Sequence, residues 1–493
     1  MDDCISGLKA FPPDSGFPKT DRLYHDSLVA HVSSLDGLIR KHRSIILAKA
    51  EHILSNLQAD LHTASYVSVI DAVLRTEPKT LLPHHTFLNQ IIECLVLFDQ
   101  RQVRYVGTSF RSIMEYVLLN KVYSPAVSVD AVATALLRLD PSGSVFTSTH
   151  SVFANLVYST GCIDEARPIL EKPAIFYPDP TSQPKLLCDE LLAPVAYITK
   201  YTGLTADLTT SSVLEYDMMR ALIFIQERRW APALDALERC INFPTDEVAV
   251  SSIMVQAFYK WVLVSLILHG RIIGLPGSPS AATTLAYETS GEPYVRLDTY
   301  FAEEDASGLL EHKRQHKSTF AADRNLGLVD EVLVSFQKWQ IVRLGDLYSK
   351  ISISEIRQLS QSAVTGKSLE TDGEVLQLVR AMIEAKVLDG RLQSPGDGQP
   401  EYLEFLQASE GALTEAEFAR QVAAATADLD VVSAVFKTTN AGLARNQEYV
   451  KYMRQEKRRR EKDPEGRMHD LGVDFENQIE DEDLMLGVGP SEG

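Results

Sequence analysis

The stretch HSVFANLVYSTGCIDEARPIL, residues 150–170, decides the fold class. Apolar residues recur at helical spacing on both sides of Gly161, including Phe153 before it and Ile169 after it. A glycine between two short amphipathic helices is typical of a tetratricopeptide-like hairpin. One hairpin cannot bury its own apolar faces, so several hairpins must stack into a helical solenoid. We therefore expect a mainly α protein.

The chain before this hairpin carries the same pattern. Apolar residues recur every three or four positions between short polar or proline breaks, and no run alternates as strands do. The predicted helices span residues 38–57, 66–74, 86–98, 105–119 and 131–139. We assign residues 1–210 to N-terminal helical repeats.

A second hairpin is predicted at residues 215–240, with its turn at Arg228-Arg229-Trp230. An apolar helix over residues 254–268 follows it, and helices with a repeated apolar face resume from Val295. The segment between them, residues 274–292, is rich in Gly, Pro, Ser, Ala and Thr, so it is predicted to be a loop.

The pattern changes after residue 346. Ser352 and Glu355 have the spacing of a capping box at the start of a short helix, and a second helix is predicted at residues 374–386. Two strand-like runs then flank a Pro-Gly turn. Helix, turn, helix and a two-stranded wing indicate a winged helix over residues 347–406. With the hairpins of residues 211–346 it forms the second predicted domain, 211–406.

The wing is the first candidate contact site. An unpaired strand edge can extend the sheet of a neighbouring protein. Taking the second strand of the wing as such an edge, we predict that a partner subunit binds Tyr402, Leu403, Glu404 and Phe405.

A long helix with one narrow apolar seam is the second candidate contact site. It is predicted over residues 413–462, where apolar residues alternate in steps of four and three, as in a heptad repeat. Such a seam suits a helical bundle with other chains. Its predicted contact residues are Phe418, Val422, Leu429, Val432, Phe436, Leu443, Val450 and Met453.

The end of the chain is strongly charged. The basic cluster between Lys457 and Lys462 fits a solvated helix end, a nuclear localisation patch or a contact for acidic partners. Residues 463–493 are acidic, and we expect them to be a disordered tail.

Composition indicates a folded chain without a membrane anchor. Of its 493 residues, 45% are hydrophobic and 23% are charged, which is ordinary for a globular protein. The longest strongly apolar run, residues 261–268, is much shorter than the roughly 20 residues that span a bilayer. The N-terminus has no basic stretch followed by an apolar one, so we expect a place inside the cell.

Several chemistries are disfavoured by the sequence. The five cysteines are solitary, without zinc-site spacing, so we interpret them as reduced core residues. The net charge of -19 disfavours nucleic-acid binding, because an acidic chain repels phosphate groups. The predicted second helix of the winged helix carries Asp372, Glu374 and Glu384 against Arg380 and Lys386, which favours protein contact over DNA reading.

No catalytic, cofactor-binding or metal-binding residue is predicted. A zinc isopeptidase needs two histidines in H-x-H spacing, and none of the twelve histidines has it. His312 and His316 are four apart without a third ligand, and we interpret them as part of an exposed helical face. Gly366-Lys367-Ser368 ends like a phosphate-binding loop, but Gln361 stands where the earlier glycine is required.

Four stretches in the second domain together resemble one known family. They are YKWVLVSLILHGR at 259–271, HKSTF at 316–320, DRNLGLV at 323–329 and MIE at 382–384. In this order they are similar to the COP9 signalosome subunit 3 family, and the first is long and unusually specific. The resemblance covers residues 215–405 well and the earlier helices only in general character. The segment 274–292 and a lengthened, charged C-terminus depart from it.

The resemblance implies a fold and a role. In this family the repeats and the winged helix form a PCI module, and the complex removes the ubiquitin-like protein Nedd8 from cullin-RING ubiquitin ligases. The family member is a structural subunit without a cofactor, placed between subunits 1 and 8 and in the helical bundle, in cytoplasm and nucleus. Two alternatives stay open: a PCI subunit of the proteasome lid or of translation initiation factor three, and a winged-helix adaptor in mRNA export.

Overall fold

The computed structural model describes most of the chain as two compact units, Met1–Phe405 and Leu406–Gly493. The described residues are 1–13, 16–18, 20–76, 85–172, 174–178, 186–244, 250–274, 281–393, 401–406, 415–443 and 449–454. The predicted acidic tail and the basic cluster lie outside them.

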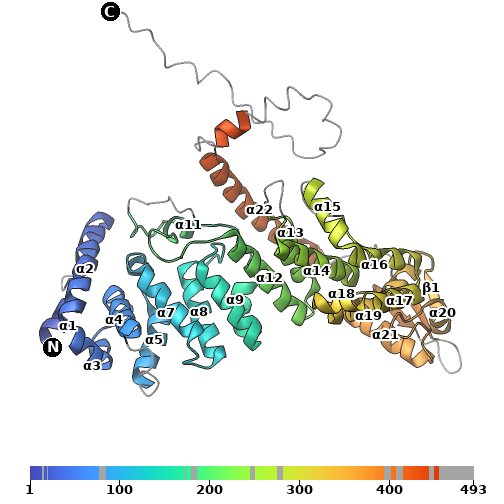
Figure 1. Cartoon of the computed structure of the whole chain (residues 1–493), viewed down its shortest axis with the longest axis horizontal. Coiled ribbons are helices and arrows are strands. Elements are labelled where there is room, and N and C mark those ends of the chain that lie inside the picture. Colours follow the sequence, from blue (N-terminus) through green and yellow to red (C-terminus); the bar gives the residue numbers. More distant parts are fainter. Residues whose placement is uncertain are drawn as a thin grey trace, which may run out of the picture. The chain divides into compact units, whose positions relative to one another are not determined.

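The first unit begins with short helices that pack side by side in a row (Figure 1). They are α1 (Asp2–Leu8), α2 (Asp21–Lys41), α3 (Arg43–Ser55), α4 (Thr63–Thr76), α5 (His85–Leu97), α6 (Gln100–Val103), α7 (Gly107–Leu119), α8 (Pro125–Leu139), α9 (Ser148–Thr160), α10 (Ile163–Leu170) and α11 (Pro194–Tyr197). The single predicted helix at 38–57 is two helices, because the chain breaks at His42, and α2 begins much earlier, where Thr20 caps it.

The hairpin that predicted the fold forms as expected. Helix α9 ends at Gly161, whose φ of +74° is the left-handed conformation that glycine adopts without strain. Helix α10 then returns, and Phe153, Val157 and Ile169 are buried in the shared core. The predicted fold class, a mainly α helical solenoid, is confirmed.

A second group of helices completes the repeats. They are α12 (Thr210–Gln226), α13 (Trp230–Ile241), α14 (Ser252–His269), α15 (Ala281–Ser290), α16 (Glu292–Glu303), α17 (Ala306–Gln315), α18 (Lys317–Ala322) and α19 (Leu326–Leu344). Among the described residues, only α14 is long and apolar enough to cross a membrane, and 61% of it is buried within the protein. Its place in the core, with Trp261 1% exposed, accounts for its apolar composition.

The loop predicted at residues 274–292 is wrong for its second half, which forms helix α15. Tyr287 anchors this helix. Its ring stacks on Phe258 with centroids 4.8 Å apart, and its hydroxyl donates to the carbonyl of Ile241 at 3.0 Å. A single buried aromatic residue on a helix of small residues gives no recurring apolar pattern, so the sequence did not indicate a helix.

The winged helix follows α19 and has its own core. It comprises β1 (Lys350–Ser352), α20 (Ile353–Leu359), α21 (Asp372–Glu384), β2 (Gly390–Gln393) and β3 (Tyr402–Phe405). The predicted capping box is present: the Ser352 side chain accepts from the Glu355 backbone N–H, and the Ser352 backbone N–H donates back to Glu355 at 3.1 Å. The Ser352 hydroxyl also donates to the Glu355 carboxylate at 2.8 Å, and this bond, followed by the one from the Ser352 backbone N–H, lowers the pKa of Glu355.

The second unit contains helix α22 (Glu415–Leu443) and a further helical turn at residues 449–454. The start of the predicted long helix at residues 413–414 and its end beyond residue 454 lie outside the described residues.

Two expectations about single residues have different outcomes. The five cysteines are free, and four of them are buried, as predicted. His312 is buried, so the predicted exposed face is wrong there: its Nε2 lies 2.8 Å from the carbonyl oxygen of Pro293 on the neighbouring helix α16.

Two buried histidines predict acid sensitivity of the repeats. Burial lowers the pKa of both His31 and His150 to about 4. In each the neutral ring is held in place: His31 lies 2.9 Å from the Ser65 hydroxyl, and His150 Nδ1 accepts from the Thr147 backbone N–H at 3.2 Å. Both histidines are protonated near pH 6.5 in the unfolded chain and only near pH 4 in the folded chain. Their contribution to the free energy of unfolding is therefore complete above pH 6.5 and is lost as the pH falls toward 4.

We expect the free energy of unfolding to drop by on the order of 3 kcal/mol per histidine between neutral pH and pH 4. Denaturant unfolding at several pH values measures it. His150→Gln should flatten the pH dependence, whereas the control His52→Gln, at an exposed position, should not. Equal slopes in the two variants would contradict the assignment.

Candidate partner-binding sites

The wing is a three-stranded antiparallel sheet in the order β1-β3-β2. Ile351 and Leu392 are both in register with Leu403, one on each side of it. Strand β3 is therefore the central strand. The predicted unpaired edge at Tyr402, Leu403, Glu404 and Phe405 is wrong, because β1 occupies one side of this strand and β2 the other.

The sequence did not indicate strand β1, which changes the contact prediction. Only its middle residue, Ile351, is buried, and three residues give no alternation that could be recognised. The outer sides of β1 and β2 are the edges of this sheet. Whether a partner contacts the four residues of β3 through their side chains stays a prediction.

Side chains of the wing reinforce its central strand. Leu403 is 0% exposed and packs in a core with Ile356, Val379 and Ile341, the last of which comes from α19. On the other face, the Lys350 ammonium lies 2.9 Å from the Glu404 carboxylate, which raises the pKa of Lys350. The winged helix is thus fixed to the end of the solenoid through α19.

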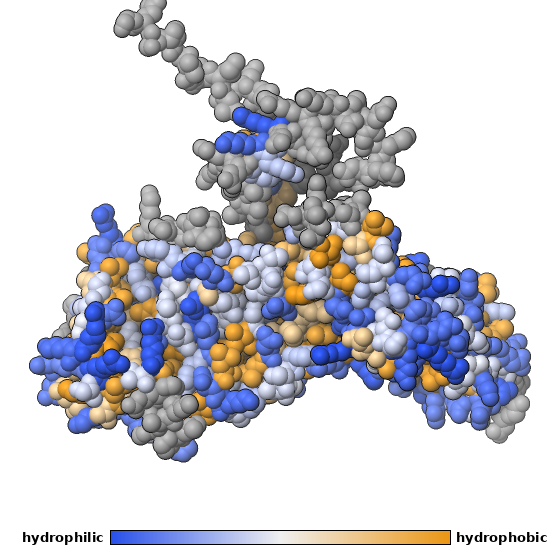
Figure 2. All heavy atoms as spheres, viewed as in Figure 1, coloured by the Kyte–Doolittle hydropathy of each residue, from blue (hydrophilic) through white to orange (hydrophobic). Residues whose placement is uncertain are grey.

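The surface of the winged-helix end is mostly hydrophilic in the view of Figure 2. Helix α21 begins with Asp372 and Glu374, and Arg357 of α20 lies 2.9 Å from the Asp372 carboxylate. An acidic helix whose basic neighbour is already paired is a poor match for DNA phosphates.

The sequence Gly366-Lys367-Ser368 belongs to a tight turn between α20 and α21. A backbone bridge joins Ser362 to Lys367, and Gly366 has a φ of +69°. The glycine therefore serves the turn. In the described part of the chain no three His, Cys, Asp or Glu side chains are grouped to hold a metal ion.

The predicted seam of α22 lies on the surface. Leu429 is 66% exposed and Val432 is 55% exposed, and Phe418, Val422, Phe436 and Met453 are exposed as well. Val450 is half-buried, and the side chain of Leu443 lies outside the described residues. A row of large apolar side chains in water is costly, and such rows mark contact sites. Which chain covers this seam stays a prediction.

Comparison with known proteins decides the family. The family model described as "COP9 signalosome complex subunit 3, N-terminal helical repeats" matches residues 25–185 and 189–283. A protein of Neurospora crassa named COP9 signalosome complex subunit 3 is 34% identical over 498 aligned residues, which cover 99% of each chain. This chain belongs to the COP9 signalosome subunit 3 family. Proteins of the same name from Emericella nidulans and Arabidopsis thaliana are 29% identical over 75% of this chain and 28% identical over 34% of it.

Membership in the COP9 signalosome subunit 3 family reaches further along the chain than the resemblance seen in the sequence. That resemblance was specific only for residues 215–405, whereas the family model begins at residue 25. The alignment with the Neurospora crassa protein covers 99% of both chains, so the C-terminus is not lengthened relative to that relative. The N-terminal repeats are thus a family feature, although their individual helices carry few distinctive residues.

Proposed function

We propose that this chain is a non-catalytic structural subunit of the COP9 signalosome, which holds neighbouring subunits in register while the complex removes Nedd8 from cullin-RING ligases. The observation that carries the proposal is the 34% identity over 99% of both chains to a protein named COP9 signalosome complex subunit 3. Identity along the whole length supports the same overall assembly role, because scaffolding depends on every contact surface of a chain.

Three features of the chain support a scaffold. The stacked hairpins form an extended surface of the kind that solenoids use for binding proteins. The winged helix offers two sheet edges, β1 and β2. Helix α22 offers an exposed apolar seam. Each can bind a different neighbour, and we propose subunits 1 and 8 and the helical bundle of the complex as these neighbours, in cytoplasm and nucleus.

Affinity purification of the tagged full-length chain from its own cells, followed by mass spectrometry, tests this function. We expect the other COP9 signalosome subunits in near-equal amounts, with 1 and 8 retained longest as salt increases. Recovery of proteasome-lid or initiation-factor subunits instead would favour the paralogue alternative, and recovery of mRNA-export proteins would favour the adaptor. Microscopy of the tagged chain tests the two compartments.

A separate prediction follows from the proposed non-catalytic role and concerns the activity of the purified chain. The purified chain alone is expected to leave a neddylated cullin intact, because its sequence lacks the H-x-H ligands of a zinc isopeptidase. Gel electrophoresis of the cullin over time measures this. Cleavage that stops when a chelator is added would refute the proposed role.

A further inference from the structure

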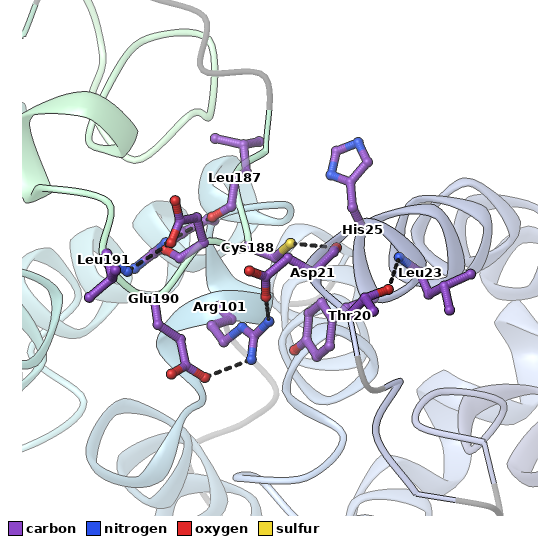
Figure 3. Close-up of polar contacts among 12 residues, drawn as sticks. Thr20, Asp21, Leu23, His25, Arg101, Leu187, Cys188, Glu190 and Leu191 are labelled. Atoms are coloured by element: carbon purple, nitrogen blue, oxygen red, sulfur yellow. Dashed lines mark hydrogen bonds and ion pairs between the residues drawn. The ribbon is translucent and has the colours of Figure 1, made fainter.

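A small polar pocket lies among the N-terminal repeats and shares no residue with the wing. It has a volume of about 310 Å³ and is lined by Phe98, Arg101, Arg104, Arg138 and Glu190, among others. Phe98 follows α5, Arg101 belongs to α6, and Arg138 lies in the last turn of α8. Glu190 belongs to the connecting segment 186–193 between α10 and α11. Figure 3 shows Arg101 reaching between this segment and Asp21 at the start of α2.

The three arginine side chains of the pocket are held in place by aromatic rings. The guanidinium carbon of Arg104 lies 3.8 Å from the centre of the Tyr197 ring, and that of Arg101 lies 4.0 Å from the centre of the Tyr24 ring. Arg138 lies over Phe98 at 5.1 Å. Stacked guanidinium groups lose little conformational freedom when they bind an anion, so the pocket is preorganised.

Two of these three positive charges have no carboxylate partner among the residues that the structure describes. Arg101 pairs with Asp21 and Glu190, each at 2.8 Å. By contrast, Arg104 donates to the carbonyls of Leu187 and Asp189, and Arg138 donates to the carbonyl of Phe98. Within the described ranges neither of them has a carboxylate within ion-pair distance, and the Nε of each is buried without a hydrogen-bond partner.

The one further carboxylate in the pocket does not neutralise them. Asp99 accepts from the Arg101 backbone N–H at 2.9 Å and from Tyr24 and Gln102 at 3.1 Å each. Arg104 is 2% exposed, so its charge is buried. A buried charge without a counter-ion is costly, and an incoming carboxylate would remove that cost.

The residue that follows Glu190, which lines the pocket, carries an apolar side chain. Leu191 follows Glu190 directly and is 95% exposed, although it is held in a tight turn by the bond from its backbone N–H to Asp189 at 2.9 Å. In Figure 3 its side chain points away from the surrounding residues. An exposed leucine one residue from the pocket lining, together with two arginines that lack a carboxylate partner among the described residues, matches a ligand with both a charge and an apolar group.

We propose that the pocket and Leu191 form a docking site for a short acidic and apolar segment of a partner protein. A carboxylate of the segment pairs with Arg104 and Arg138, and the apolar residue beside it covers Leu191. This site is additional to the contacts of the wing and of α22, and it does not depend on which complex the chain joins.

Fluorescence anisotropy with the full-length chain tests the site. The probe is the labelled peptide Asp-Glu-Asp-Leu-Leu with blocked ends, and the matched peptide is Asn-Gln-Asn-Leu-Leu. We expect only the acidic peptide to bind, and we expect Arg138→Gln to weaken it about tenfold through the loss of a charge-assisted contact. Leu191→Ser should weaken it several-fold. Arg75→Gln, an exposed cation of α4 paired with Asp71, is the control and should leave binding unchanged.

Leu191→Ser keeps the test decisive, because a side chain that is 95% exposed contributes little to folding. Equal binding of the amide peptide, or equal effects of Leu191→Ser and Arg75→Gln, would overturn the proposal. Binding of inorganic phosphate that Arg138→Gln abolishes, without any binding of the acidic peptide, would also overturn it and would identify a site for a small free anion.

Discussion

A chain carrying both Leu429→Asp and Val432→Asp is expected to lose its place in the complex while its repeats stay folded. The two side chains are 66% and 55% exposed in the isolated chain, so they contribute little to its own stability. In a helical bundle the same side chains would be buried, and each new carboxylate would then cost several kcal/mol unless it found a partner. Two such costs lower the affinity by at least about a hundredfold.

Co-purification in moderate salt measures this loss, and circular dichroism checks that the helices remain. The matched control is Ala416→Asp with Ala423→Asp. It adds the same two charges to exposed positions of the same helix, both off the seam. Assembly should survive in the control. If the seam variant co-purified as well as the control did, the contact of α22 with other chains would be refuted.

The sequence was sufficient to predict those elements that are set by the spacing of residues along the chain. The hairpin around Gly161, the second hairpin with its turn before Trp230 and the capping box at Ser352 all depend on neighbours within a few residues of each other. Local spacing determines such features, so they could be predicted without the rest of the fold.

Features that depend on distant residues were missed. Helix α15 exists because Tyr287 stacks on Phe258 from another helix, and strand β1 exists because Leu403 pairs with Ile351 more than fifty positions earlier. The burial of His312 likewise depends on α16. In each case the neighbouring residues in the sequence show no recurring apolar pattern, and the structure is determined by a contact with a distant part of the chain.

Among the candidate sites, the small polar pocket with its three arginines is the clearest example of a feature that depends on distant residues. Arg101 and Arg104 are close in sequence, but Arg138 and Glu190 come from separate elements. Nothing in the spacing of these residues marks them as a group. Only the stacking of helices brings the three guanidinium groups to one place. Among the described residues, Arg101 pairs with two carboxylates, whereas Arg104 and Arg138 donate to backbone carbonyls.

The second large effect is expected at the wing, where Leu403→Pro should unfold the winged helix. Leu403 is 0% exposed, and replacing a buried leucine with a smaller residue costs about 2–5 kcal/mol. Proline also has no N–H for the sheet. The backbone N–H of Phe405 donates to Ser349, next to β1, and these groups alternate along a strand, so the N–H of Leu403 faces β1 too. Proline therefore removes a bond to β1.

Leu392→Pro in the neighbouring strand separates folding from association. Since Leu403 directs its N–H toward β1, it is not hydrogen-bonded to its register partner Leu392, whose N–H therefore points to the open side of β2. Proline there keeps the bonds to β3 and removes a donor from the sheet edge.

Thermal unfolding should show an early transition in Leu403→Pro and a smaller shift in Leu392→Pro, which keeps the bonds to β3 and loses only a partly buried side chain from the core of the winged helix. Both variants should co-purify poorly with partners if a neighbouring subunit pairs with the edge of β2. Full assembly of Leu392→Pro would mean that the edge of β2 is not used, and the edge of β1 would then be the remaining edge of this sheet for such pairing.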